Sequence, residues 1–302
     1  MLQTFKKPLI NRPHTSYRGR FAPSPSGFLH FGSLVAALAS FLQAKSLQGQ
    51  WLVRIEDIDP PRAKPGADVA ILNTLEAYGM HWDEEVLYQS KQSELYIEVL
   101  SYLKSSALSY NCQCTRGQIK QTGGIYQSTC KDLCLPEGNT ATRLINNFPF
   151  AQFNDLLQGR VFVNKELAGE DFIIHRRDGL FAYQLAVVVD DIFQGITEVV
   201  RGCDLLEPTA RQLTLFSTLK FTPPKYLHIP LAVTDAGYKL SKQNSAPAID
   251  NQNPQPALIH ALQFLGQKPP IDLLNESVDN IINWAIKHWQ VQNIPQKREI
   301  SL

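Results

Sequence analysis

Two short loops hold side chains suited to binding the phosphates of a nucleotide. The first is Arg20-Phe21-Ala22-Pro23-Ser24-Pro25-Ser26-Gly27-Phe28-Leu29-His30-Phe31-Gly32, a Pro/Gly-rich turn between a short apolar strand and an amphipathic helix. The free N–H groups and positive dipole end of such a helix attract anions. The second is Lys239-Leu240-Ser241-Lys242-Gln243, whose ammonium groups can neutralise charge as pyrophosphate leaves. Together the loops predict an ATP site at which a carboxylic acid is activated.

Each loop also has a simpler explanation. The first is typical of an ordinary turn before a helix, with His30 packed against a sheet. Two nearby lysines in a loop are usually just solvated. Because both loops follow predicted strands, their joint presence favours the nucleotide site over coincidence.

Four of the five cysteines lie between Cys112 and Cys134. An odd number of cysteines disfavours a disulfide framework, whereas close spacing favours tetrahedral zinc. Spacing alone selects Cys112, Cys114, Cys130 and Cys134, and reduced cysteines without a metal are the alternative. Cys203 stands apart and is predicted to be a small buried apolar residue.

The elements that must position these residues read as an α/β protein. A strand at 17–21, a helix at 33–47 and a strand at 51–55 predict a parallel crossover unit. The segment from Glu56 to Arg62 leaves the carboxyl end of the second strand, where ligands bind in open parallel sheets. Further elements are predicted as helices at 67–78, 93–103, 183–189 and 207–219, strands at 141–145, 160–163, 197–201 and 226–233, and a helical region at 254–290.

The order of these elements predicts an interrupted nucleotide-binding domain. Residues 1–16 read as a leader, 17–89 as the first half of the domain and 181–245 as its second half. Residues 90–180 read as a mixed insertion that contains the cysteines, and 246–302 as a small C-terminal helical region. A chain of 302 residues suits one core domain with such an insertion.

Composition narrows the class of protein. Hydrophobic content of 44% and charged content of 19% are those of a folded soluble protein, and no run of about 18 apolar residues predicts a membrane span. No signal segment is recognisable, so we expect a cytoplasmic protein. The net charge of +1 means that any RNA binding must come from local basic residues.

Three motifs resemble those of class I aminoacyl-tRNA synthetases, most closely the glutamyl branch. The first loop is similar to the His-Ile-Gly-His region, Arg54-Ile55-Glu56-Asp57-Ile58-Asp59 to the second motif, and Lys239–Gln243 to the Lys-Met-Ser-Lys-Ser loop. The resemblance runs from about Tyr17 to Lys242. Two signature positions differ, because Ser33 replaces the second histidine and Gln243 the final serine; glutamyl enzymes also vary at the former.

This resemblance implies a Rossmann-like parallel sheet with an inserted zinc-bearing domain, and it implies roles for individual residues. His30, Gly32, Lys239 and Lys242 would bind ATP together with Mg²⁺, with His30 and Lys242 catalytic. Glutamate would be bound by Arg20, Phe21, Ala22, Pro23, Ser24, Glu56, Tyr183 and Arg201. Among these, Arg20 and Arg201 would take the side-chain carboxylate and Glu56 the ammonium group.

Two of these positions have structural alternatives on the sequence alone. Arg201 could form an ion pair with Asp190 or Asp191, and Tyr183 could be ordinary helix core. For the zinc, the resemblance implies Cys112, Cys114, Tyr126 and Cys130, with Cys134 as a rival for the fourth position.

Only 60 residues follow Lys242, too few for the helical anticodon-binding domains of full glutamyl-tRNA synthetases. A short chain of this kind resembles the glutamyl-Q tRNA(Asp) synthetases. That family activates L-glutamate without tRNA and attaches it to the queuosine base at the wobble position of tRNA(Asp). The resemblance therefore implies queuosine-bearing tRNA(Asp) as a partner, and we expect a monomer. Candidate RNA phosphate contacts are Arg116, Lys120, Arg143, Arg176 and Arg177.

Two alternatives stay open at this point. One is a truncated glutamyl-tRNA synthetase that charges a tRNA 3′ end. The other is a non-catalytic paralogue that binds RNA or an amino acid.

Overall fold

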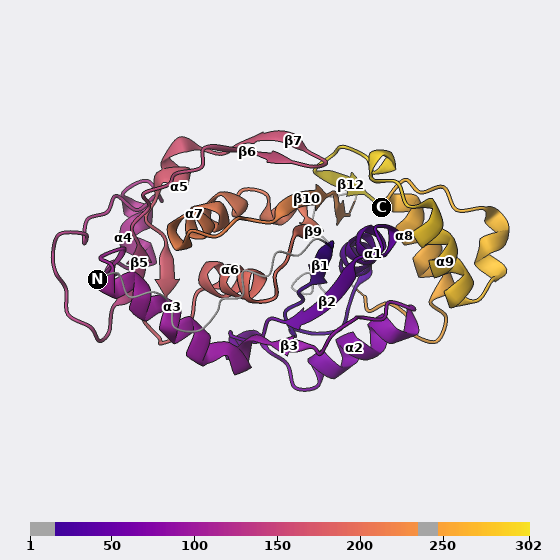
Figure 1. Ribbon diagram of the computed structural model, residues 1–302, viewed down its shortest axis with the longest axis horizontal. Coiled ribbons are helices and arrows are strands. Elements are labelled where there is room, and N and C mark those ends of the chain that lie inside the picture. Colours follow the sequence, from indigo (N-terminus) through magenta and orange to yellow (C-terminus); the bar gives the residue numbers. More distant parts are fainter. Residues whose placement is uncertain (1–15, 235–246) are drawn as a thin grey trace.

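The computed structural model describes residues 16–234 and 247–302 (Figure 1). Its centre is a parallel sheet in the order β1 (Arg18–Phe21), β2 (Gln50–Ile55), β3 (Leu87–Tyr88). A second parallel pair, β9 (Glu198–Gly202) and β10 (Lys225–Ile229), lies beside β1, where the Thr197 N–H donates to the Arg18 carbonyl at 2.9 Å. The spatial order β3-β2-β1-β9-β10 confirms the predicted parallel arrangement.

Helices pack against the strands, and the apolar side chains of both form a common hydrophobic core. The longer ones are α1 (Phe31–Ser46), α2 (Ala67–Ala77), α3 (Ser93–Ser105), α6 (Tyr183–Phe193), α7 (Thr209–Leu219), α8 (Gln255–Phe264) and α9 (Val278–His288). The first helix is present as predicted, and its apolar residues Leu34, Leu38, Phe41 and Leu42 are buried, but nearly every residue from 34 to 44 is buried too, so the helix is enclosed and not amphipathic. The C-terminal helices α8 and α9 pack into the same apolar cluster as α1. Figure 1 shows these two helices at one end of the molecule.

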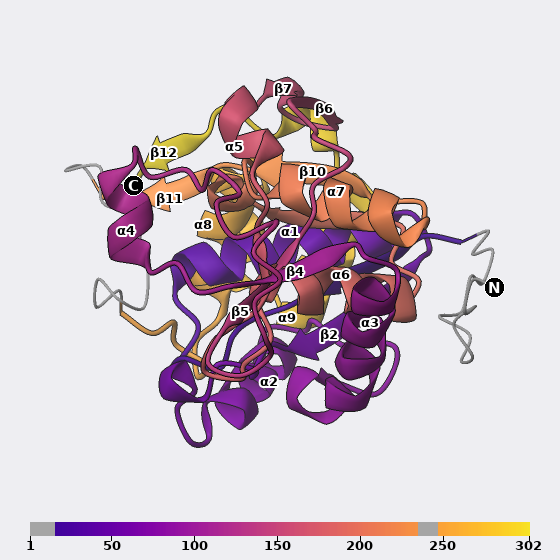
Figure 2. The same cartoon turned by 90° about the vertical axis from the view of Figure 1, so that its left-hand side faces the viewer.

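The insertion is built from short antiparallel strands. β4 (Ser109–Cys112), β5 (Ala141–Leu144) and β8 (Ile173–His175) form one sheet, and β6 (Gln152–Asp155) and β7 (Gly159–Phe162) form a hairpin. The short helices α4 (Arg116–Gln121) and α5 (Lys165–Gly169) complete it. Figure 2 looks onto this side, with α3, β4 and β5 toward the viewer. α3, from the predicted insertion, shares an apolar cluster with α6 and α7 of the nucleotide-binding domain. The apolar core is therefore continuous across the predicted boundary, and the domain boundaries stay predictions.

Two elements differ from expectation. The strand predicted at 226–233 is divided into β10 and β11 (Leu231–Val233), because Pro230 has no N–H to continue the ladder with β9. β11 pairs instead with β12 (Glu299–Ser301) near the end of the chain. The predicted helical region at 254–290 is two helices, with Pro269 and Pro270 in the connection between them.

No helix in the described part of the chain is long and apolar enough to cross a membrane. Residues 1–15, most of the predicted leader, lie outside the described residues. So do Lys239 and Lys242 of the second phosphate-type loop.

Candidate active site

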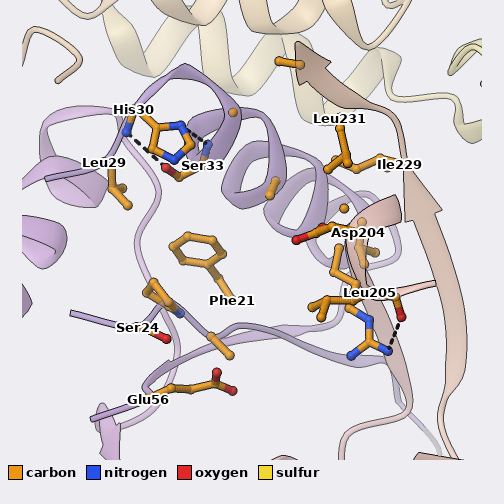
Figure 3. Close-up of a pocket in the computed structure, with 18 of the residues that line it drawn as sticks. Phe21, Ser24, Leu29, His30, Ser33, Glu56, Asp204, Leu205, Ile229 and Leu231 are labelled. Atoms are coloured by element: carbon orange, nitrogen blue, oxygen red, sulfur yellow. Dashed lines mark hydrogen bonds between the residues drawn. The ribbon is translucent and has the colours of Figure 1, made fainter. Parts of the chain in front are cut away.

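One cavity of about 880 Å³ opens at the carboxyl ends of β1, β2 and β9. Its lining contains His30 and Gly32, and it contains every residue expected to bind glutamate: Arg20, Phe21, Ala22, Pro23, Ser24, Glu56, Tyr183 and Arg201. In Figure 3, His30, Ser24 and Glu56 lie on one side, while Asp204, Leu205 and Ile229 lie across from them. The structure thus brings together residues that are far apart in the sequence.

The histidine of the first loop caps the helix that follows. The Ser33 N–H donates to His30 Nδ1 at 3.3 Å, and the His30 N–H donates to Ser33 Oγ at 3.0 Å. This reciprocal capping box fixes the ring at the start of α1, as Figure 3 shows. Serine at position 33 therefore has a structural use, and Gly27, with a positive φ of 145°, permits the turn that precedes it.

Behind the cavity lies a buried cluster of charges. Arg20 Nε is 3.2 Å from Asp191 Oδ1, and Arg54 Nη2 is 2.7 Å from the same oxygen. The neighbouring Asp190 accepts from the Gln89 amide at 2.7 Å and from the Tyr96 hydroxyl at 2.8 Å. Burial opposes the ionisation of Asp191, yet the two arginines hold its pKa below the usual value. The alternative that Arg201 pairs with Asp190 or Asp191 is wrong, because Arg20 and Arg54 are the partners.

Glu56 adds an uncompensated acid to this cluster. Its Oε1 is buried with no hydrogen-bond partner in the described structure. Burial raises the pKa of Glu56 to about 7, although Arg54 and Arg20 act in the opposite direction. With Glu56 ionised, two arginines face three carboxylates in this cluster, so an arriving ammonium group would restore neutrality.

Arg201 is held differently from Arg20. Its Nε donates to His228 Nε2 at 3.0 Å, and its Nη2 donates to the Thr209 hydroxyl and the Gln212 carbonyl oxygen, both at 2.8 Å. The remaining nitrogen, Nη1, is buried and has no hydrogen-bond partner among the described residues. A buried guanidinium edge left unpaired is suited to a carboxylate oxygen.

Tyr183 is the first residue of α6; it lines the cavity and also packs against the apolar cluster shared by α3, α6 and α7, so both readings of this residue stay open. Burial raises the pKa of its hydroxyl to about 12, which keeps that group neutral. The hydroxyl can therefore donate or accept a hydrogen bond near a bound ligand.

Three of the clustered cysteines meet in the insertion. The Sγ atoms of Cys112, Cys114 and Cys130 lie within 4.8 Å of one another. The Tyr126 ring packs in the same cluster, and its hydroxyl accepts the Cys130 N–H at 2.9 Å. Cys134 is exposed and is not part of the group. Three sulfurs at this spacing could hold a metal ion.

The basic residues proposed to contact RNA have varied surroundings. Arg116 and Lys120 are exposed on α4, and Arg176 is paired with Asp178 and Asp59. Arg143 is buried: its guanidinium lies 3.6 Å from the centre of the Tyr126 ring and donates to the Asp171 carbonyl at 2.6 Å. Arg143 is therefore part of the packing around the cysteines, and its prediction as a phosphate contact is wrong.

Sequence reasoning missed the residues that hold Arg201. His228 was given no role, although it interrupts an apolar strand, and the β9–β10 register places it opposite Arg201. A polar residue in each of two adjacent apolar strands could have indicated that Arg201 and His228 interact. Asp155, which contacts His228, carried no signal, because it reaches the site from the inserted hairpin.

The comparisons with known proteins agree with this geometry. Residues 16–272 match the family described as tRNA synthetases class I (E and Q), catalytic domain. The chain is 63% identical over 308 residues to the glutamyl-Q tRNA(Asp) synthetase of Colwellia psychrerythraea, covering 98% of each protein. It is 55% identical over 287 residues to the protein of the same name from Shigella flexneri, covering 95% of this chain and 93% of that one.

Two solved structures share the fold. One is a glutamate tRNA ligase from Elizabethkingia meningosepticum in complex with its amino acid, with a TM-score of 0.76 and 23% identity. The other is the glutamate-tRNA synthetase of Elizabethkingia anophelis, with a TM-score of 0.77 and 23% identity. They cover 93% and 95% of this chain, which spans 66% and 68% of theirs.

Proposed function

This chain belongs to the class I tRNA synthetases of the E and Q type, among the relatives named glutamyl-Q tRNA(Asp) synthetase, and we propose that it activates L-glutamate with ATP and transfers it to queuosine in tRNA(Asp). In the first step an α-carboxylate oxygen attacks the α-phosphorus of ATP. The bond to the bridging oxygen breaks, and glutamyl-adenylate and pyrophosphate form. No tRNA is needed for this step in the proposal.

The amino-acid assignment rests mainly on two buried polar atoms of opposite charge that belong to residues lining the same cavity and that lack hydrogen-bond partners. Arg201 Nη1 and Glu56 Oε1 are both buried without hydrogen-bond partners in the described structure. The first suits a side-chain carboxylate and the second an α-ammonium group. A substrate with an α-ammonium group and a side-chain carboxylate satisfies both, whereas glutamine would leave the guanidinium facing a neutral amide. Glutamate therefore fits this cavity better than its amide.

The nucleotide would lie at the start of α1. His30 and the Gly32 amide line the cavity at that helix terminus, where the dipole favours phosphate. Mg²⁺ would accompany the ATP. Catalysis would then consist of positioning the carboxylate and stabilising the charge that develops on the phosphates.

Lys239 and Lys242 keep their proposed roles at the leaving pyrophosphate. Their segment is outside the described residues, but the chain on either side of it touches the site. Ala232 lines the cavity, and Ala248 forms an isolated β-bridge with His30. The described residues on both sides of the segment thus lie beside the cavity, which supports the proposal that one of its lysines serves the reaction.

For the insertion, we propose a structural zinc ion held by Cys112, Cys114, Cys130 and Tyr126. The three sulfurs converge within 4.8 Å, and Tyr126 packs against them, which supports this set over one with Cys134. A bound metal would fix the segment between β4 and β5, and its role would be structural because no cavity residue of the adenylate site belongs to it.

The acceptor is tested by glutamylation assays on tRNA(Asp) with and without queuosine, followed by identification of the linked nucleoside. We expect labelled glutamate on the queuosine-bearing tRNA only, and on the modified base. Charging of a tRNA 3′ end would instead support the truncated glutamyl-tRNA synthetase. The shared fold of longer glutamate-tRNA synthetases is compatible with both acceptors, so this assay separates them.

A further inference from the structure

His228 and Asp155 form a buried pair directly behind Arg201. Neither side chain of the pair is exposed to solvent, and neither residue lines the cavity. His228 Nδ1 lies 2.6 Å from Asp155 Oδ2, and His228 Nε2 lies 3.0 Å from Arg201 Nε. The three residues come from β6, β10 and β9, so the inserted hairpin is linked through the sheet to the cavity wall.

This geometry sets the tautomer of the imidazole. Arg201 Nε–H can only donate, so His228 Nε2 must accept and carries no proton. The proton is then on Nδ1, where it is donated to Asp155. The Thr209 hydroxyl, also near Nε2, donates instead to the Leu205 carbonyl at 2.8 Å and does not compete. Burial lowers the pKa of His228, which favours this neutral form.

A neutral acceptor fixes Arg201 without cancelling its charge. All four acceptors around Arg201 are uncharged: His228, Thr209, Gln212 and the Leu205 carbonyl. Arg20, by contrast, is paired directly with the Asp191 carboxylate. These neutral acceptors occupy Nε and Nη2, so Nη1 stays available to an incoming anion, and none of the four acceptors cancels the delocalised charge of the guanidinium.

We propose that Asp155 and His228 are positioning residues that orient the Arg201 guanidinium toward the side-chain carboxylate of the substrate. This inference rests on the proposed function, since it assigns the carboxylate of glutamate to Arg201. The new element is that selectivity for an acidic side chain depends on the tautomer of His228, a residue that does not line the cavity. Asp155 stabilises this tautomer by accepting the Nδ1 proton, while Arg201 Nε–H donates to the opposite nitrogen.

Three substitutions separate positioning from packing. His228→Asn keeps a donor toward Asp155 but removes the acceptor that faces Arg201. His228→Gln, the matched control, can place an amide oxygen near the Nε2 position and so keeps that acceptor. Asp155→Asn can keep the oxygen that accepts from the Leu157 and Gln158 N–H groups, while its amide faces His228 Nδ1. That arrangement would move the imidazole proton to Nε2, where it opposes Arg201 Nε–H.

The test is glutamate-dependent ATP–pyrophosphate exchange by the full chain, with thermal unfolding of each variant measured in parallel. We expect His228→Asn and Asp155→Asn to raise the KM for glutamate at least tenfold and to reduce discrimination against glutamine. The KM for ATP should change less than twofold, and His228→Gln should stay within threefold of wild type for glutamate.

Several outcomes would overturn the inference. An unchanged glutamate KM in His228→Asn and Asp155→Asn would do so, as would equal losses in His228→Asn and His228→Gln. If either His228→Asn or Asp155→Asn loses its cooperative unfolding transition, the glutamate KM of the other variant decides. Loss of that transition in all three would make the pair structural only. Wild-type protein without any glutamate-dependent exchange would instead overturn the proposed function itself.

Discussion

Arg20 forms an ion pair with Asp191, with 3.2 Å between Nε and Oδ1, even though Arg20 lines the cavity. The two arginines expected to share the substrate carboxylate are thus not equivalent. The charge of Arg20 is already compensated by Asp191, whereas Arg201 has neutral acceptors and an unpaired nitrogen. Arg201 should therefore contribute more than Arg20 to recognition of an acidic side chain.

Replacing Arg201 should remove glutamate activation. Arg201→Ala takes away the buried, unpaired guanidinium nitrogen proposed to bind the side-chain carboxylate, so we expect kcat/KM for glutamate to fall at least ~100-fold. ATP–pyrophosphate exchange measures this directly. Arg160→Ala is a matched control, because Arg160 is exposed on the β6–β7 hairpin and bonds to Gln152. Near-wild-type exchange in Arg201→Ala would refute the side-chain assignment.

Activity should depend on the ionisation of Glu56. Burial raises its pKa to about 7, so below that pH the carboxyl is protonated and neutral. A neutral carboxyl attracts an ammonium group less, and kcat/KM for glutamate should fall as pH decreases through about 7. Glu56→Gln should be less active and should lose this dependence. A pH profile identical in wild type and Glu56→Gln would exclude Glu56 as its source.

Stability should depend strongly on Arg54, which the resemblance marked only as part of a motif. Arg54 is fully buried and contacts Asp191 and the Gln194 side chain. Arg54→Met leaves the Asp191 charge with one partner fewer in a buried setting, at a cost of about 3–5 kcal/mol in the free energy of unfolding. Urea denaturation measures this cost. The exposed pair of Lys104 and Glu137 gives the comparison: Lys104→Gln should cost far less than Arg54→Met.

Metal content should distinguish the two candidates for the fourth ligand. Protein purified without chelator should contain about one zinc ion per chain if the cysteine cluster binds metal as a tetrahedral site. Cys130→Ser should lose this metal and Cys134→Ser should keep it, while Tyr126→Phe should bind it more weakly. Elemental analysis of each variant provides the measurement. Loss of zinc in Cys134→Ser, with zinc retained in Tyr126→Phe, would reverse the assignment.

Local patterns predicted the parallel core well because each element there carries its own signal. Leu34, Leu38 and Leu42 recur at helical spacing in α1, and the Pro/Gly-rich segment that contains Gly27 forms the turn before it. The division of one predicted strand into β10 and β11 was also readable in principle, since Pro230 cannot donate to a ladder. In these regions sequence-local chemistry decides the structure.

Other features depend on contacts between distant segments and could not be read locally. β12 pairs with β11 although many residues separate them, and Asp155 reaches His228 from the insertion. Likewise, nothing near Arg20 indicates that it pairs with Asp191 while Arg201 does not. Such choices are set by packing in three dimensions, so they appear only once the strands are placed side by side.

The central claim is that this cavity selects a substrate with one ammonium group and an acidic side chain, and activates it with ATP. Exchange of labelled pyrophosphate into ATP, in the absence of tRNA, tests it most directly. The account predicts exchange with glutamate and at least ~100-fold lower kcat/KM with glutamine. Exchange that is equally efficient with glutamine, or absent with glutamate, would contradict it.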